Sequence, residues 1–147
     1  MTRQFKRLSH SLYECKYHIV FCPKYRHRIF KEDVADYTYQ QIQDLCRYKD
    51  AVEVLELNIQ VDHIHLMVSI APKYAVSEFM GYLKGKLALR LFRQYEHLGK
   101  RFWGRHLWAN GYCVSTIGLD EERIRKYVKW QEAQEKHAEL TQQRLFG

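Results

Sequence analysis

Apolar residues recur along the chain at two different spacings, which predicts alternating strands and helices. Short β-rich runs bounded by turn residues predict strands over residues 17–23, 51–60, 63–70 and 112–118. Longer segments with apolar residues three and four positions apart predict helices over residues 31–50, 77–96 and 119–140. The expected order of elements is therefore β-α-β-β-α-β-α.

Six of these seven elements match the ferredoxin-like, or RRM-like, split βαβ order. This is an α+β fold, with two helices on one face of an antiparallel sheet and one helix left over at the C-terminus. The alternation in 51–60 slips after Val54, which is typical of a β-bulge. Asp33 and Asp120 are the expected N-caps of the first and last helices, and Ser77 opens the second.

Two histidines interrupt the apolar run VDHIHLMVSI at residues 61–70. Because side chains alternate along a strand, Ile64 and Leu66 fall on the core face, while His63 and His65 fall on the open face. Residues two apart along a strand are about 6.6–6.8 Å apart, so both imidazoles can reach one divalent ion. A pair of surface histidines without a ligand remains the alternative.

The last predicted helix carries a second pair of chemically useful residues. Tyr127 and Gln131 are four positions apart and share one helix face. The amide oxygen of Gln131 suits a hard cation such as Mg²⁺ or Mn²⁺, and the Tyr127 hydroxyl would lie one turn away. The alternative is an amphipathic helix whose tyrosine packs on the sheet.

The composition of the chain indicates its number of domains, its class of partner and its compartment. The 147 residues are 46% hydrophobic with only 2 prolines, so one domain over residues 1–147 is expected. The net charge of +7 favours a polyanionic partner, most simply nucleic acid. The four cysteines form no CxxC pair and indicate reduced thiols in a cytoplasmic protein. No apolar run is long enough for a bilayer, so no membrane partner is expected.

Basic residues cluster in three segments that could contact nucleic acid. The second helix has a row of basic residues that forms either a ridge for phosphates or a solvated face. Segments 23–28 and 100–108 mix basic and aromatic residues, as single-strand binders do. The candidate DNA-binding residues are Lys24, Arg26, Lys84, Lys86, Arg90, Arg93 and Arg105.

Four ordered segments together resemble the His-hydrophobe-His tyrosine transposases of the IS200/IS605 insertion-sequence family. These segments are CKYHIVFCPKYRHRIF (15–30), DHIHLMVSIAPK (62–73), FMGYLKGKLALRLF (79–92) and GYCVSTIGLDEERIRKYVKWQ (111–131). One departure is Leu87, where the family often has a small hydroxyl residue. The resemblance implies a metal-dependent transposase that cleaves and rejoins insertion-sequence ends in single-stranded DNA.

The resemblance also implies a role for each matching residue. His63, His65 and Gln131 would bind Mg²⁺ or Mn²⁺, and Tyr127 would attack a DNA phosphate to form a 5′-phosphotyrosine. The implied partners are single-stranded DNA with hairpins at the element ends and a second copy of the chain. In that homodimer the Tyr127 helix of one subunit completes the histidine site of the other, although a helix packed on its own sheet is equally allowed.

Three further alternatives remain open from the sequence. Asp62 could orient a metal ligand or simply begin the strand. The whole domain could be an RRM-like module that binds RNA on its open sheet face. It could also be a related nickase or repeat-processing enzyme with the same chemistry.

Overall fold

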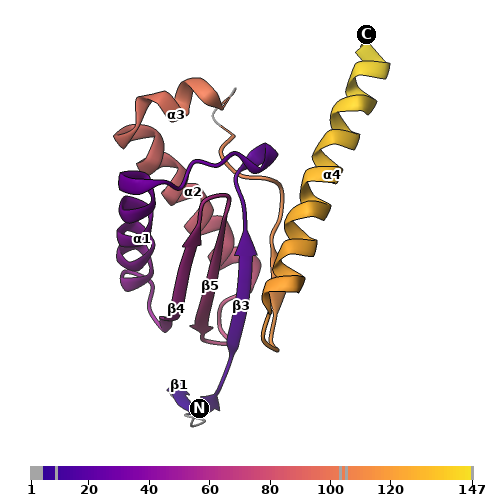
Figure 1. Ribbon diagram of the computed structural model, residues 1–147. Helices are drawn as coiled ribbons and strands as arrows, with labels where there is room; N and C mark the ends of the chain where they lie inside the picture. Colours follow the sequence, from indigo (N-terminus) through magenta and orange to yellow (C-terminus); the bar gives the residue numbers. More distant parts are fainter. Residues whose placement is uncertain (1–4, 9, 103, 105, 147) are drawn as a thin grey trace.

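The computed structural model describes residues 5–8, 10–102, 104 and 106–146, and a four-stranded antiparallel sheet lies at its centre (Figure 1). The strand order is β4-β5-β3-β6. The strands are β3 (Lys16–Phe21), β4 (Val52–Gln60), β5 (His63–Ile70) and β6 (Cys113–Ser115). Because β5 lies between β3 and β4, the split βαβ arrangement and the α+β fold class are confirmed.

Two helices, α1 (Glu32–Arg47) and α2 (Val76–Gln94), cover one face of this sheet. The apolar stripe of α2 is fully buried there, as its spacing predicts. The same core takes in the inward-facing residues of β3 and β5 and the buried side of α1. The main core members are Ile19, Phe21, Ile42, Leu45, Ile64, Leu66, Val68, Phe79, Leu83, Leu87 and Leu91.

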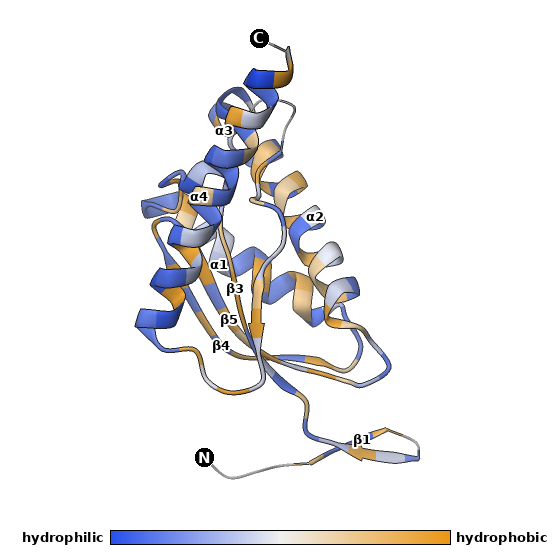
Figure 2. Ribbon diagram, turned by 90° about the vertical axis from the view of Figure 1, so that its right-hand side faces the viewer, coloured by the Kyte–Doolittle hydropathy of each residue, from blue (hydrophilic) through white to orange (hydrophobic). Residues whose placement is uncertain are grey.

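The last helix, α4 (Glu121–Phe146), crosses the opposite face, so the strands lie between α4 and α2 (Figure 2). A small second cluster of Val20, Ile124 and Val128 holds it there. Its N-cap is Asp120, whose Oδ1 accepts the backbone N–H of Arg123 at 2.9 Å, as expected. The helix continues past residue 140, where the sequence prediction ends, and its last turns project from the body.

Several short elements differ from the sequence prediction. The hairpin β1 (Lys6–Leu8) and β2 (Ser11–Tyr13), the 3₁₀ turn η1 (Lys24–Arg26) and the helix α3 (Glu96–Arg101) have between three and six residues each. Such lengths are too short for a periodic signal. The strand predicted over 112–118 shortens to Cys113–Ser115. The bulge in β4 is confirmed by a register shift between Val54 and Glu56.

The starts of two helices also need correction. Asp33 lies inside the first turn of α1, and the N-cap position belongs to Lys31, which makes no capping bond through its side chain. Helix α2 begins at Val76, one residue before Ser77. All four cysteines are free thiols. Within the described ranges, no helix combines the length and the hydropathy that a bilayer crossing needs.

Candidate active site

His63 and His65 lie on the face of β5 that turns away from the main core. Their neighbours Ile64 and Leu66 are fully buried on the other face, which confirms the predicted alternation. The two histidines line one cavity of about 240 Å³ between the sheet and the start of α4. Oxygen-bearing side chains in the same cavity are Asn58, Gln60 and Glu121.

His63 is held by a chain of hydrogen bonds that runs through the neighbouring Asp62 to Arg26 in η1. Its Nδ1 lies 2.9 Å from Asp62 Oδ1, and Asp62 Oδ2 accepts Arg26 Nε at 2.8 Å. Burial alone would raise the pKa of Asp62, but the hydrogen bonds from Arg26 and His63 outweigh it and lower the pKa. An ionised carboxylate only accepts hydrogen bonds, so Nδ1 of His63 carries its proton. In the neutral ring, Nε2 of His63 is then the atom with the free lone pair.

His65 has a histidine neighbour that the sequence analysis missed. His18 Nδ1 lies 3.3 Å from His65 Nε2, and the two ring centroids are 5.5 Å apart. Burial, with a further contribution from His18, lowers the pKa of His65 and favours its neutral form. The alternation of β3 contained the signal, because Ile19 faces the core and His18 must therefore share the open face with Val20.

Tyr127 packs against the small apolar cluster under α4, as Cys113 and Leu119 also do. Its hydroxyl is buried and has no hydrogen-bond partner among the described residues. Burial raises the pKa of Tyr127 well above its usual value, and Cys22 and Cys113 add to the shift. In this placement of α4, the phenol is a poor nucleophile.

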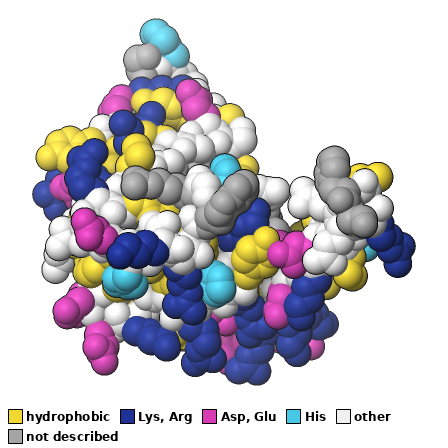
Figure 3. Space-filling view, turned by 90° about the horizontal axis from the view of Figure 1, so that it is seen from above, with side chains coloured by type: hydrophobic (Ala, Val, Ile, Leu, Met, Phe, Trp, Pro, Cys, Tyr) yellow, Lys and Arg dark blue, Asp and Glu magenta, His cyan; other side chains and the backbone are white. Residues whose placement is uncertain are grey.

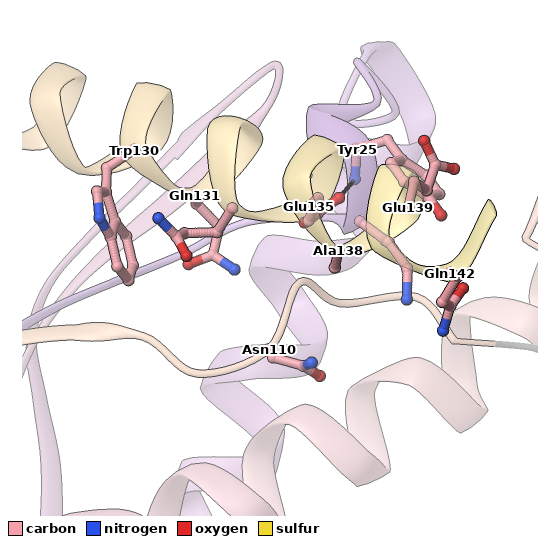
Figure 4. A pocket seen from close by; sticks show the side chains of 10 residues that line it. Tyr25, Asn110, Trp130, Gln131, Glu135, Ala138, Glu139 and Gln142 are labelled. Atoms are coloured by element: carbon pink, nitrogen blue, oxygen red, sulfur yellow. Dashed lines mark hydrogen bonds between the residues drawn. The ribbon is translucent and has the colours of Figure 1, made fainter. Parts of the chain in front are cut away.

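Gln131 faces a different cavity from the histidines (Figure 4). This second cavity of about 350 Å³ lies between α4, η1 and the loop before β6, and Trp130 and Asn110 also line it. Gln131 is only 5% exposed. The structure therefore separates the residues that the sequence groups together, with His63 and His65 in one cavity and Gln131 in another.

The chemistry of the histidine cavity suits a divalent ion as far as one chain supplies ligands. A fixed protonation site on His63 and a neutral His65 offer two imidazole nitrogens. The described residues contain no group of three or more His, Cys, Asp or Glu side chains that could hold an ion. Gln131 lines another cavity, so its amide could join these two nitrogens only with a different placement of α4.

Comparison with known proteins decides the family. The model of the family described as "Transposase IS200 like" matches residues 11–131. The chain belongs to the IS200-like transposases. It is 41% identical over 134 residues to the transposase for insertion sequence element IS200 of Salmonella typhimurium, covering 91% of this chain and 88% of that protein. It is 34% identical over 125 residues to the ISDra2 transposase TnpA of Deinococcus radiodurans, covering 84% and 89%.

Solved structures agree with this IS200-like assignment. A crystal structure of a candidate transposase from Deinococcus radiodurans superposes with a TM-score of 0.76 at 29% identity, covering 86% of this chain and 97% of that one. The structure of a REP tyrosine transposase bound to a REP hairpin superposes with a TM-score of 0.50 at 10% identity, covering 82% and 66%. The second likeness concerns the fold alone.

In this IS200-like chain, two of the candidate DNA-binding residues, Lys84 and Arg90, form hydrogen bonds with other parts of the protein. Lys84 Nζ donates to the backbone carbonyls of Ala109 and Gly111, at 3.1 and 2.9 Å. Burial lowers its pKa. Arg90 donates to Asp44 on α1 at 2.7 Å. These two cations hold the loop before β6 and the two core helices together.

The other candidates differ in their freedom to meet DNA. Arg26 is paired with Asp62 and Glu132, whereas Lys86 and Arg93 are exposed and make no ion pair within the described ranges. Lys24 lines the cavity that contains Gln131. Arg105 lies outside the described residues. Seen from above, Lys and Arg side chains gather along one side of the molecule, with histidines beside them (Figure 3).

Proposed function

We propose that this IS200-like transposase cleaves and rejoins single-stranded DNA through a 5′-phosphotyrosine on Tyr127. The observation that carries the proposal is the pair of oriented imidazoles, His63 and His65, on the sheet face that α4 crosses. Tyr127 belongs to that helix, in a chain whose family is that of transposases. When bound there, Mg²⁺ or Mn²⁺ would neutralise and orient a phosphate, with His63, His65 and Gln131 as ligands.

The covalent step follows from the chemistry of a phenol and a phosphodiester. The Tyr127 oxygen forms a bond to phosphorus and loses its proton, while the bond to the 3′-oxygen breaks and that oxygen leaves as a 3′-hydroxyl. The phosphotyrosine ester conserves the bond energy of the cut strand. A different 3′-hydroxyl can therefore attack it, release Tyr127 and join two strands without ATP.

The placement of α4 supports a site shared between two copies of the chain. With α4 on its own sheet, the Tyr127 hydroxyl is buried and Gln131 faces another cavity. Residues 116–118 in the connection from β6 to α4 are exposed, and the apolar cluster under the helix is small. The proposed homodimer exchanges these helices, so that each Tyr127 meets the histidines of the other subunit.

The proposed substrate is single-stranded DNA that folds into hairpins at the ends of the element. The basic side of the molecule and the exposed Lys86 and Arg93 support a polyanionic partner. The sheet face has histidines and a covering helix where an RRM-like module needs exposed aromatic residues, which favours the enzyme over a binding module.

One experiment tests the proposal directly. The protein is incubated with Mg²⁺ and single-stranded DNA from the flank of the element that encodes it, and a denaturing gel reveals any protein–DNA adduct. We expect an adduct that forms only with Mg²⁺ or Mn²⁺ and only on the single strand. Free cleavage products without an adduct would instead indicate direct hydrolysis.

A further inference from the structure

Three side chains, those of Glu132, Arg26 and Asp62, form a continuous series of hydrogen bonds from α4 to His63. Arg26 reaches in two directions, with Nε 2.8 Å from Asp62 Oδ2 and one terminal nitrogen 3.1 Å from Glu132 Oε2 on α4. The other oxygen of Asp62 accepts His63 Nδ1 at 2.9 Å. Both oxygens of one carboxylate are therefore committed to two donors.

The backbone conformation of η1 places Arg26 between Asp62 and Glu132. Tyr25 and Arg26 have φ angles of 57° and 55°, in the left-handed region that side chains disfavour. Each such residue costs about 1–2 kcal/mol, so two in succession persist only where other contacts hold them. The contacts here are the two ion pairs of Arg26 and the hydrogen bond from the Tyr25 backbone N–H to Glu135 on α4.

We infer that Asp62 and Arg26 are positioning residues that fix the proton of His63 on Nδ1 and so leave Nε2 free for a metal ion. Arg26 can only donate, so it holds one oxygen of Asp62, and the remaining oxygen must accept the Nδ1 proton of His63. The inference rests on the proposed metal role of His63. It gives Asp62 the orienting task that the sequence left open, and it gives Arg26 a task other than phosphate contact.

An asparagine at position 62 makes the inference sharply testable. Asparagine has one acceptor oxygen and one donor NH₂ group. If Arg26 keeps the oxygen, the NH₂ group of Asp62→Asn faces His63 Nδ1 and forces the proton of the neutral ring onto Nε2. The same inversion of a histidine by an Asp→Asn change is known from the serine protease triad. Asp62→Ala, by contrast, imposes no proton position.

The first measurement is the tautomer of His63, read from ¹⁵N–¹H spectra of the metal-free protein. We expect the Nδ1–H form in the wild type, the Nε2–H form in Asp62→Asn, and a return to Nδ1–H in the double variant Asp62→Asn with Arg26→Met. The return follows because the introduced asparagine can turn its oxygen to His63 once the competing donor is gone. Glu132→Gln is the matched control, since it removes the other ion pair of Arg26 and leaves the tautomer unchanged.

The second measurement is the affinity for Mn²⁺, followed by electron paramagnetic resonance. Loss of an orienting partner of this kind typically weakens metal binding about 10–100-fold, and we expect Asp62→Asn to be weaker than Asp62→Ala. An Nδ1–H tautomer in Asp62→Asn, or no recovery in the double variant while both remain folded, would overturn the inference. If the wild type and the variants show their expected tautomers but the wild type binds no Mn²⁺, the proposed metal role would be overturned instead.

Discussion

The hydroxyl of Tyr127 combines a chemical role with a cost in the folded chain. It is buried without a partner among the described residues, although it is the proposed nucleophile. A buried hydroxyl that makes no hydrogen bond is destabilising because its bonds to water are lost. A movement of Tyr127 that lets its hydroxyl form hydrogen bonds again would therefore remove this cost.

Tyr127→Phe separates these two properties. We expect the variant to lose the DNA adduct completely and to raise the free energy of unfolding by about 1 kcal/mol, because the unpaired hydroxyl is gone. The measurements are the denaturing gel and urea denaturation. Tyr82→Phe is the control, because the Tyr82 hydroxyl donates to Leu45 O at 2.9 Å and its loss should lower stability by about 1 kcal/mol. An undiminished adduct in Tyr127→Phe would exclude this residue as the nucleophile.

The two histidines of β5 allow a direct test of the metal role. We expect His63→Ala or His65→Ala to abolish cleavage, and a chelator to do the same to the wild type. DNA binding should survive in part, because it depends on Lys and Arg side chains. His137→Ala is the control, since His137 is exposed on α4 and should be dispensable. Full-rate cleavage in the presence of chelator would rule out the ion.

At the scale of elements, α2 shows that one helix can use its lysines in two ways. Lys84 points to the loop before β6 and holds two of its carbonyls, and Trp108 Nε1 donates back to Lys84 O at 2.9 Å. Lys86, two residues further along the same helix, is exposed. The sequence offers both as phosphate contacts, because charge alone does not show which lysine finds a partner inside the protein.

Substitution of Lys84 should therefore affect mainly stability, and substitution of Lys86 mainly DNA binding. We expect Lys84→Met to lower the free energy of unfolding by roughly 1–3 kcal/mol, because it leaves two carbonyls without their donor. Lys86→Met should leave stability unchanged and weaken binding to single-stranded DNA, with the salt dependence reduced by about 0.7 in log–log slope for the lost phosphate contact. Denaturation and binding at several salt concentrations measure both. A reduced salt slope in folded Lys84→Met would restore Lys84 as a DNA contact.

The long periodic elements were predictable, and the short or partner-dependent ones were not. Strand β5 and helix α2 follow from alternation and from the leucine stripe, since burial of one face dictates the spacing. The hairpin β1–β2 and helix α3 are too short to show a period. The site was predicted in part: His63 and His65 were placed on the correct face. Alternation along β3 places His18 on the open face, but no local pattern shows which distant residue it meets. The contacts of His18 with His65, of Arg26 with Asp62 and of Lys84 with the loop before β6 all join distant segments.

At the scale of the whole molecule, the proposed exchange of α4 between two subunits predicts complementation. A His63→Ala chain and a Tyr127→Phe chain are co-expressed with different tags, and the doubly tagged dimer is purified. If sites are shared, one site combines the intact histidines of one subunit with the intact Tyr127 of the other, so cleavage should return. If each chain builds its own site, both sites lack a part. A pure mixed dimer without activity, beside an active wild type, would therefore exclude the exchange in the cleavage step.

Among the residues that the structure describes, buried apolar side chains form two clusters on opposite faces of one sheet. The large one joins β3, β5, α1 and α2, whereas the small one attaches α4 through Val20, Ile124 and Val128. Protection of backbone amides against hydrogen exchange follows the free energy of the smallest opening that exposes them. The amides of α4 should thus exchange together and sooner than those of β3 and β5, at denaturant concentrations where the sheet is still closed. The helix with the proposed nucleophile would then be a separate unit of local unfolding, able to detach while the rest of the fold persists.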